Sequence, residues 1–171
     1  TNVSRSKKFN DANVTGTGFT FINKKNTYGT DGSFALSQQI SKSTENTKGE
    51  TELGYRYFLG IRKTSGTVRW GISRSGVDAK FNRTDLGYYA IQNREVMNAY
   101  LTFYRFKTYK KVQEGNTEFS SNYNTRLTNG VRSFFEIRNN SFVLFTSGNA
   151  VFGGVGFTPL VCRDYDPRLN G

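Results

Sequence analysis

Strict alternation of apolar and polar side chains along Glu52 to Arg62 constrains the fold of this chain more than any other feature. Successive side chains of a β-strand point to opposite faces, so a period of two predicts a strand with two chemically different faces. At strand rise, this stretch would span about 35 Å, which is long for a globular strand and suits a tilted strand that crosses a membrane. Phe58 is the one apolar residue on the polar side.

The alternation continues in the next segment and assigns side chains to two faces. Thr64-Ser65-Gly66 forms a tight turn, so the two predicted strands make a hairpin. We expect three basic side chains to face a water-filled interior: Arg56, Arg62 and Arg69. We expect the opposite, apolar side to face lipid: Leu53, Tyr55, Tyr57, Leu59, Ile61, Val68, Trp70 and Ile72.

The same pattern, less regular elsewhere, predicts an antiparallel meander of about eight long strands in a single unit over residues 1–171. The predicted strands are 14–22, 28–40, 52–62, 67–74, 96–107, 117–127, 132–145 and 150–158. Further turns are predicted at Asn23-Lys24-Lys25-Asn26, Glu114-Gly115-Asn116 and Ser147-Gly148-Asn149. The links after the first, third, fifth and seventh strands are short, whereas those at 41–49 and 76–94 are long and polar. This parity is typical of outer-membrane barrels.

The composition agrees with strands that have lipid on one side and water on the other. Only 35% of the residues are hydrophobic, yet 15% are aromatic, with 15 Phe and 10 Tyr. This balance is unusual for a two-layer soluble fold and suits barrel strands. No apolar run is long enough for a transmembrane helix. We therefore predict an all-β fold that is a section of a transmembrane β-barrel in contact with outer-membrane lipid.

The sequence offers little for catalysis or for cofactor binding. It contains no His and a single cysteine, Cys162, which excludes Ser-His and Cys-His nucleophile pairs, an intrachain disulfide and the usual zinc sites. Asp164 and Asp166 are interpreted as solvated loop residues, and Cys162 as an inert thiol. Gly153-Gly154 lacks the strand–helix context of a phosphate-binding loop. We expect a non-enzymatic protein without cofactor or metal.

The net charge of +11 leaves other classes of function open. One alternative is a soluble basic β-sandwich or jelly roll, such as a capsid-like protein that binds nucleic acid through Arg5, Lys7 and Lys8. Another is a glycan-binding module that uses exposed Tyr side chains and Trp70. A nucleic-acid platform would place aromatic and basic side chains on one face. Here they alternate between faces in the clearest strand, which disfavours nucleic acid as a partner.

Two motifs resemble a known family. FNRTDLGYYAIQNRE (81–95) is similar to a loop of a Bacteroidota outer-membrane β-barrel family that is known only as a domain of unknown function. FGGVGFTPLVCRDYDPRLNG (152–171) is similar to the glycine-rich strand and the following loop of that family. Arg83 stands where the family has Pro. The residues that carry the resemblance include Asp85, Leu86, Gly87, Tyr165, Pro167 and Arg168.

The resemblance implies a bacterial outer-membrane location, behind a periplasmic module similar to family-9 carbohydrate-binding domains. Members of that family are much longer, which implies that this chain is a section of a larger barrel. Closure of the eight strands into a small barrel is the alternative. In either case we expect solute passage, or docking of partners such as other subunits of an outer-membrane complex, as the function.

Overall fold

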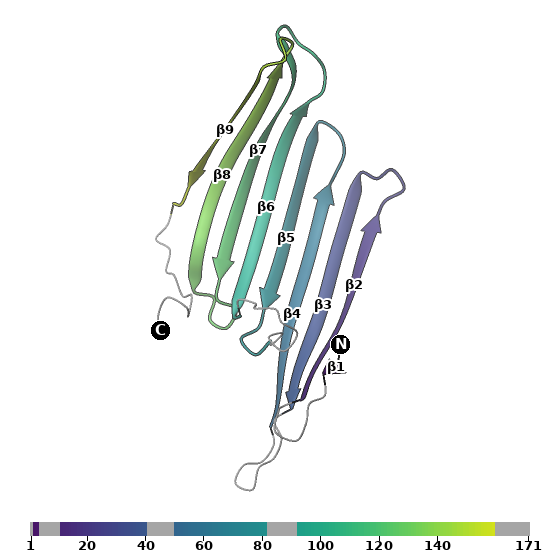
Figure 1. Cartoon of the computed structure of the whole chain (residues 1–171), viewed down its shortest axis with the longest axis vertical. Coiled ribbons are helices and arrows are strands. Elements are labelled where there is room, and N and C mark those ends of the chain that lie inside the picture. Colours follow the sequence, from purple (N-terminus) through teal and green to yellow (C-terminus); the bar gives the residue numbers. More distant parts are fainter. Residues whose placement is uncertain (1, 4–10, 41–49, 82–91, 160–171) are drawn as a thin grey trace.

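The computed structural model describes residues 2–3, 11–40, 50–81 and 92–159, and these form one antiparallel sheet whose strands follow one another in sequence order (Figure 1). The eight long strands confirm the predicted all-β meander. The described residues contain no helix, and so none that is long and apolar enough to cross a membrane. The strands are β1 (Asn2–Val3), β2 (Asp11–Ile22), β3 (Tyr28–Ile40), β4 (Thr51–Lys63), β5 (Val68–Val77), β6 (Arg94–Arg105), β7 (Val112–Thr125), β8 (Arg132–Phe145) and β9 (Ala150–Phe157).

Four short turns join the strands at one end of the sheet, the upper end in Figure 1. They occupy residues 23–27, 64–67, 106–111 and 146–149. Each contains one residue with positive φ: Asn26 (52°), Gly66 (90°), Lys110 (55°) and Gly148 (82°). Left-handed backbone of this kind closes tight hairpins. The connections at the other end, 41–50, 78–93 and 126–131, are longer on average.

The turn predicted at Glu114-Gly115-Asn116 is wrong, because these residues lie inside β7. The chain turns earlier, and β7 begins at Val112 rather than at 117. A Cβ on Gly115 would lie 2.9 Å from the carbonyl oxygen of Phe142 in β8. This glycine therefore permits a close approach of two strand backbones. The turn-like residues around it, Glu114 and Asn116, gave no indication of this role. At its other end β7 stops at Thr125, so Leu127 lies beyond the strand.

Strand register shows that the two faces of the sheet differ along its whole width. Paired residues of neighbouring strands share a face. One side, here called the apolar face, carries Phe19, Phe21, Phe34, Leu36, Leu53, Tyr55, Tyr57, Leu59, Ile61, Val68, Trp70, Ile72, Leu101 and Phe103. The other side, here called the polar face, carries Asp31, Ser33, Arg56, Arg62, Arg69, Asn98, Glu118, Asn122, Glu136 and Arg138.

The strand ends are staggered across the sheet. β4 ends at Lys63, and the row of paired residues that starts there crosses β5, β6 and β7 and reaches Asn139 of β8. From Asn139, β8 continues for five more residues before its last pair with β9. At the opposite end, the row through Thr125 of β7 reaches Tyr57, and β4 continues six residues beyond it, to Thr51. Figure 1 shows the turns stepping upward from β2–β3 through β4–β5 to β6–β7, with the β8–β9 turn beside the last of these.

The sheet is a single layer with two free edges. No pairing among the described residues joins β9 to β1 or β2. No second layer packs on the apolar face there, since its large side chains remain exposed, Leu53 by 59% and Ile72 by 54%. Within the described residues, Phe81 is the one hydrophobic residue that is fully buried. Among the described residues, the side chains therefore lie on two open faces and form no central core.

Candidate functional site

The predicted arginines and the predicted apolar residues lie on opposite sides of the sheet. Arg56, Arg62 and Arg69 project from the polar face, because Arg62 is paired with Gly71 and the other two have the same parity in β4 and β5. All eight residues predicted to face lipid project from the apolar face. That the apolar face meets lipid, and the polar face a water-filled interior, stays a prediction.

The arginines of the polar face have different partners. Arg62 forms an ion pair with Asp31 of β3, whose carboxylate also accepts a hydrogen bond from Thr20 (3.1 Å). The guanidinium of Arg69 lies 4.3 Å from the ring centroid of Tyr104. Arg94 donates to the side-chain oxygen of Asn124 (2.8 Å). The polar face of β4–β6 therefore carries four arginines, of which one is neutralised by a described carboxylate.

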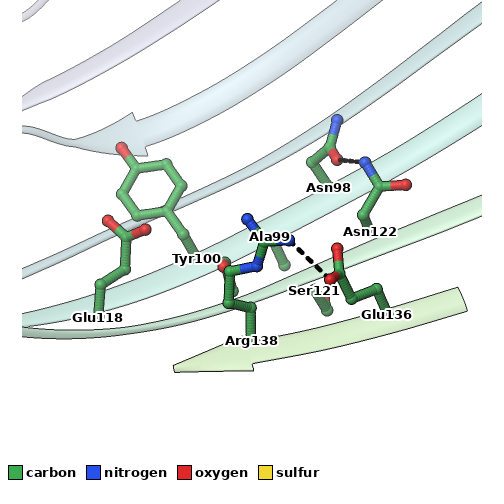
Figure 2. Close-up of a pocket in the computed structure, with 9 residues that line it drawn as sticks. Asn98, Ala99, Tyr100, Glu118, Ser121, Asn122, Glu136 and Arg138 are labelled. Atoms are coloured by element: carbon green, nitrogen blue, oxygen red, sulfur yellow. Dashed lines mark hydrogen bonds and ion pairs between the residues drawn. The ribbon is translucent and has the colours of Figure 1, made fainter. Parts of the chain in front are cut away.

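The polar face of β6–β8 is lined by amides and carboxylates (Figure 2). Asn122 donates to Asn98 (2.7 Å), and Arg138 pairs with Glu136 (2.8 Å). Figure 2 also shows Tyr100 and Glu118 side by side. These strands enclose a depression of about 310 Å³ lined by Asn98, Tyr100, Glu118, Ser120, Asn122, Glu136 and Arg138, among others. Its chemistry is that of hydrogen bonding and charge recognition.

A second depression, of about 580 Å³, continues from Arg138 towards β9. It is lined by residues 152–156 of β9 and, among others, by Asn140 and Phe142 of β8. Glycines 154 and 156 lie on the polar face, where Asn140 and Glu136 occupy the space that side chains would need. The two depressions share Arg138, so the polar face is hollowed across several neighbouring strands.

A short segment after β5 folds back over the polar face. The amide of Asp78 donates to the carbonyl of Tyr55 (2.9 Å), and the amide of Phe81 donates to the carbonyl of Asp78 (3.2 Å). Gln92 holds the segment by donating to the carbonyl of Phe81 (2.9 Å). A Cβ on Gly54 would overlap the backbone of residues 80 and 81. The segment 78–81 therefore covers one end of the polar face of β4.

One charged cluster interrupts the apolar face. Glu95 of β6 pairs with Arg74 of β5 (2.7 Å) and accepts a hydrogen bond from the hydroxyl of Tyr57 of β4. The three residues lie near the end of the sheet with the longer connections. Tyr57, predicted to face lipid, thus lies on the apolar face but has a polar partner there. The alternation in β4 gave no sign of this, because the partners come from β5 and β6.

Sequence reasoning missed most of the β6–β8 half of the site. Tyr104, Glu118, Glu136 and Arg138 are not among the predicted site residues, because they share a face only through the register of β6, β7 and β8. Two features made these residues hard to predict. The turn before β7 was placed too late, and β7 and β8 carry polar side chains on both sides, so their alternation is weak. Among the described residues, no cluster of three or more His, Cys, Asp or Glu side chains is arranged to hold a metal ion.

The motif residues Asp85, Leu86, Gly87, Tyr165, Pro167 and Arg168, and also Cys162, Asp164 and Asp166, lie outside the described residues. The segment 78–81, which leads into the first motif, is described.

The fold and the site define an all-β protein built from one two-faced antiparallel sheet, apolar on one side and charged on the other. The chain belongs to the family described as a domain of unknown function (DUF5916), whose model matches residues 1–171. No curated protein and no solved structure matches the chain.

Proposed function

We propose that the chain is a section of a bacterial outer-membrane β-barrel, with the apolar face towards lipid and the polar face towards a water-filled lumen. Its function in this proposal is non-enzymatic and consists of solute passage or docking of partner subunits. The observation that carries the proposal is the persistence of two different faces over a single open layer of eight long strands. An exposed apolar surface of this extent needs an apolar environment.

The stagger of the strand ends supports the proposal independently. A sheet closes into a barrel when its strands tilt and their register shifts steadily. Strands rise about 3.3 Å per residue and lie about 4.8 Å apart. The shift of five residues over the four spacings from β4 to β8 then corresponds to a tilt of about 40° to the barrel axis, and the shift of six residues over the three spacings from β7 to β4 corresponds to about 55°. The first value lies in the range of membrane barrels, about 35–45°.

The free edges favour a section over a complete small barrel. β9 and most of β2 present unpaired backbone groups along one side within the described residues. Unpaired amides and carbonyls cannot face hydrocarbon, because each unsatisfied group costs several kcal/mol there. Further strands on both sides would satisfy them. We propose, from the resemblance of the loop motifs, that these strands belong to a larger barrel of a Bacteroidota outer membrane.

The soluble alternatives require the apolar face to pack against another layer. Leu53, Tyr55 and Leu59 are all more than one-third exposed, and every long strand lies in the same sheet. A β-sandwich would divide the strands between two sheets and bury their inner faces. The single layer therefore argues against a capsid-like or glycan-binding sandwich made of these strands alone.

Detergent dependence and vesicle insertion test the proposal. The full-length protein that contains this section, whose further strands would pair with the free edges, is refolded from urea into buffer, into detergent micelles and in the presence of lipid vesicles, and analysed by light scattering and vesicle flotation. We expect aggregation in buffer and co-flotation with vesicles. A monodisperse, folded chain in plain buffer would contradict the proposal. If that soluble chain also bound single-stranded nucleic acid with steep salt dependence, the soluble alternative would be supported.

A further inference from the structure

A cation and an anion lie in the same row of the polar face, two strands apart. Arg69 of β5 is paired in register with Thr102 of β6, and Thr102 is paired with Glu118 of β7. Because paired residues share a face, all three side chains project from the same side. With strands about 4.8 Å apart, the backbones of Arg69 and Glu118 are about 10 Å apart.

Neutral contacts hold both charged groups. The guanidinium of Arg69 stacks on Tyr104 at 4.3 Å, and its Nε donates to the carbonyl of Gly66 (3.4 Å). The hydroxyl of Thr102, itself only 3% exposed, donates to the carboxylate of Glu118 (3.1 Å). In the part of the chain that the structure describes, neither Arg69 nor Glu118 takes part in an ion pair. The two charges are therefore oriented but not neutralised.

Other charged pairs of the same face are neutralised within the protein. Arg62 pairs with Asp31, and Arg138 pairs with Glu136. Space next to Glu118 is also available, since this residue lines the depression of about 310 Å³ together with Tyr100 (Figure 2). The row of Arg69 and Glu118 thus combines two opposite unpaired charges with a hollow beside one of them.

We propose that this row binds small zwitterionic solutes, with their cationic group at Glu118 and their anionic group at Arg69. The strands that carry the two charges are about 10 Å apart, so a solute that makes a charge-assisted hydrogen bond to each of them has its own two charges only a few bonds apart. This spacing suits a short ω-amino acid. The site deepens the proposed function by naming a solute class, and it rests on that function only for the passage of the solute.

Binding of 4-aminobutyrate is the test, with butyrate and butylamine as probes that each keep one of its two charges. The full chain is refolded in detergent micelles, and each probe is titrated by saturation-transfer NMR. We expect 4-aminobutyrate to bind about tenfold more tightly than either single-charge probe, because only it engages both ends. Equal affinity for all three probes would overturn the proposal.

Charge variants show whether the row itself is responsible. Arg69→Gln and Glu118→Gln should each reduce the affinity for 4-aminobutyrate about tenfold. The double variant Arg69→Glu, Glu118→Arg keeps both charges in reversed order, and a small solute can turn round, so we expect affinity within about threefold of the wild type. Single variants that bind as the wild type does would contradict the site.

A matched control removes another arginine of the polar face. Arg56 is paired with Val77, which lies eight residues from Arg69 along β5, or about 26 Å at strand rise. Arg56→Gln should therefore leave the affinity unchanged, and an equal loss would mean that net charge alone attracts the solute. Circular dichroism checks the folding of each variant. If a Gln variant misfolds, Arg69→Lys and Glu118→Asp, which keep the charge and change its reach, should lower the affinity about threefold.

The two proposals fail in different ways. Vesicle flotation without zwitterion binding would overturn this site and leave the membrane barrel standing. Zwitterion binding by a chain that does not enter vesicles would overturn the barrel and leave the site standing.

Discussion

Gly54 is a residue whose missing side chain has a direct structural role. Its Cα faces the backbone of residues 80 and 81, which cross the polar face there. Ser37 of β3, which is paired with Gly54, is also buried, at 2% exposure. The absence of a side chain at Gly54 lets residues 80 and 81 pack directly against the sheet. A larger residue at this position would displace that part of the connection after β5.

Replacing Gly54 by Ala should therefore destabilise the protein. The added methyl group would force residues 80 and 81 away from the sheet, and overpacking of this kind costs about 1–3 kcal/mol. Gly153→Ala is the matched control, because it is also a strand glycine but has no atom within 4 Å of the added Cβ. Denaturant unfolding followed through Trp70 fluorescence measures both. Equal midpoints for the two variants would contradict the contact.

Glu95 is the residue that organises the charged cluster on the apolar face. It accepts hydrogen bonds from both Arg74 and Tyr57, and its side chain is 13% exposed. Because a half-buried charge without its partners is unfavourable, Glu95→Ala should cost about 1–3 kcal/mol. Glu136, which pairs with Arg138 and whose side chain is 23% exposed, supplies the comparison, and Glu136→Ala should cost less than about 1 kcal/mol.

Double-mutant cycles for Glu95 with Arg74→Ala and with Tyr57→Phe measure the coupling in the cluster. We expect a coupling free energy of about 0.5–3 kcal/mol for each pair, because the groups are in contact. Strict additivity of the single variants would mean that Glu95 is not energetically coupled to Arg74 or Tyr57.

Each long strand has one side on the apolar face and one side on the polar face. In β5, two adjacent residues allow the surroundings of the two faces to be compared. Ile72 projects from the apolar face and is 54% exposed, while Ser73 projects from the polar face. In a soluble single-layer sheet, a charge at either position would face water. In a membrane barrel the two positions would differ sharply.

Ile72→Arg should therefore impair folding into vesicles, while Ser73→Arg should not. Arginine on the lipid side near the midplane costs about 2–4 kcal/mol, whereas lumen substitutions are tolerated. Urea titration of refolding into vesicles measures both free energies. Equal effects of the two substitutions would contradict lipid on the apolar face.

β7 illustrates how an element can be predicted with the wrong start. Glu114, Gly115 and Asn116 have the composition of a turn, yet the chain turns at 106–111 and these residues are paired with β8. A register irregularity between Val112 and Glu114 accompanies the early start of the strand. Turn composition marks where a chain can bend, but pairing with the neighbouring strand decides where it does.

At the scale of the whole molecule, the stagger of the strand ends sets an orientation. If the sheet curves into a barrel with the tilt of about 40–55° estimated from its register, the strands should have that angle to the membrane normal. Polarised infrared spectroscopy of oriented bilayers that contain the refolded chain measures it from the amide I dichroism. Strands parallel to the membrane plane, or without order, would contradict the arrangement.

The local pattern of the chain was enough to predict the period-two strands, their approximate number and order, and which side chains share a face in β4 and β5. These properties follow from local geometry, because a strand sends alternate side chains to opposite sides whatever it is paired with. The hairpin at Thr64-Ser65-Gly66 and the bounds of β8 were predictable for the same reason.

The pairing of neighbouring strands and its register could be read from the three-dimensional structure alone. Arg69 and Glu118 are far apart in the sequence and lie in one row only because β5, β6 and β7 pair in a particular register. The cluster of Tyr57, Arg74 and Glu95 and the cover over Gly54 arise in the same way. Alternation fixes the face of each side chain, but its neighbours across the sheet depend on pairing between distant segments, which no local pattern encodes.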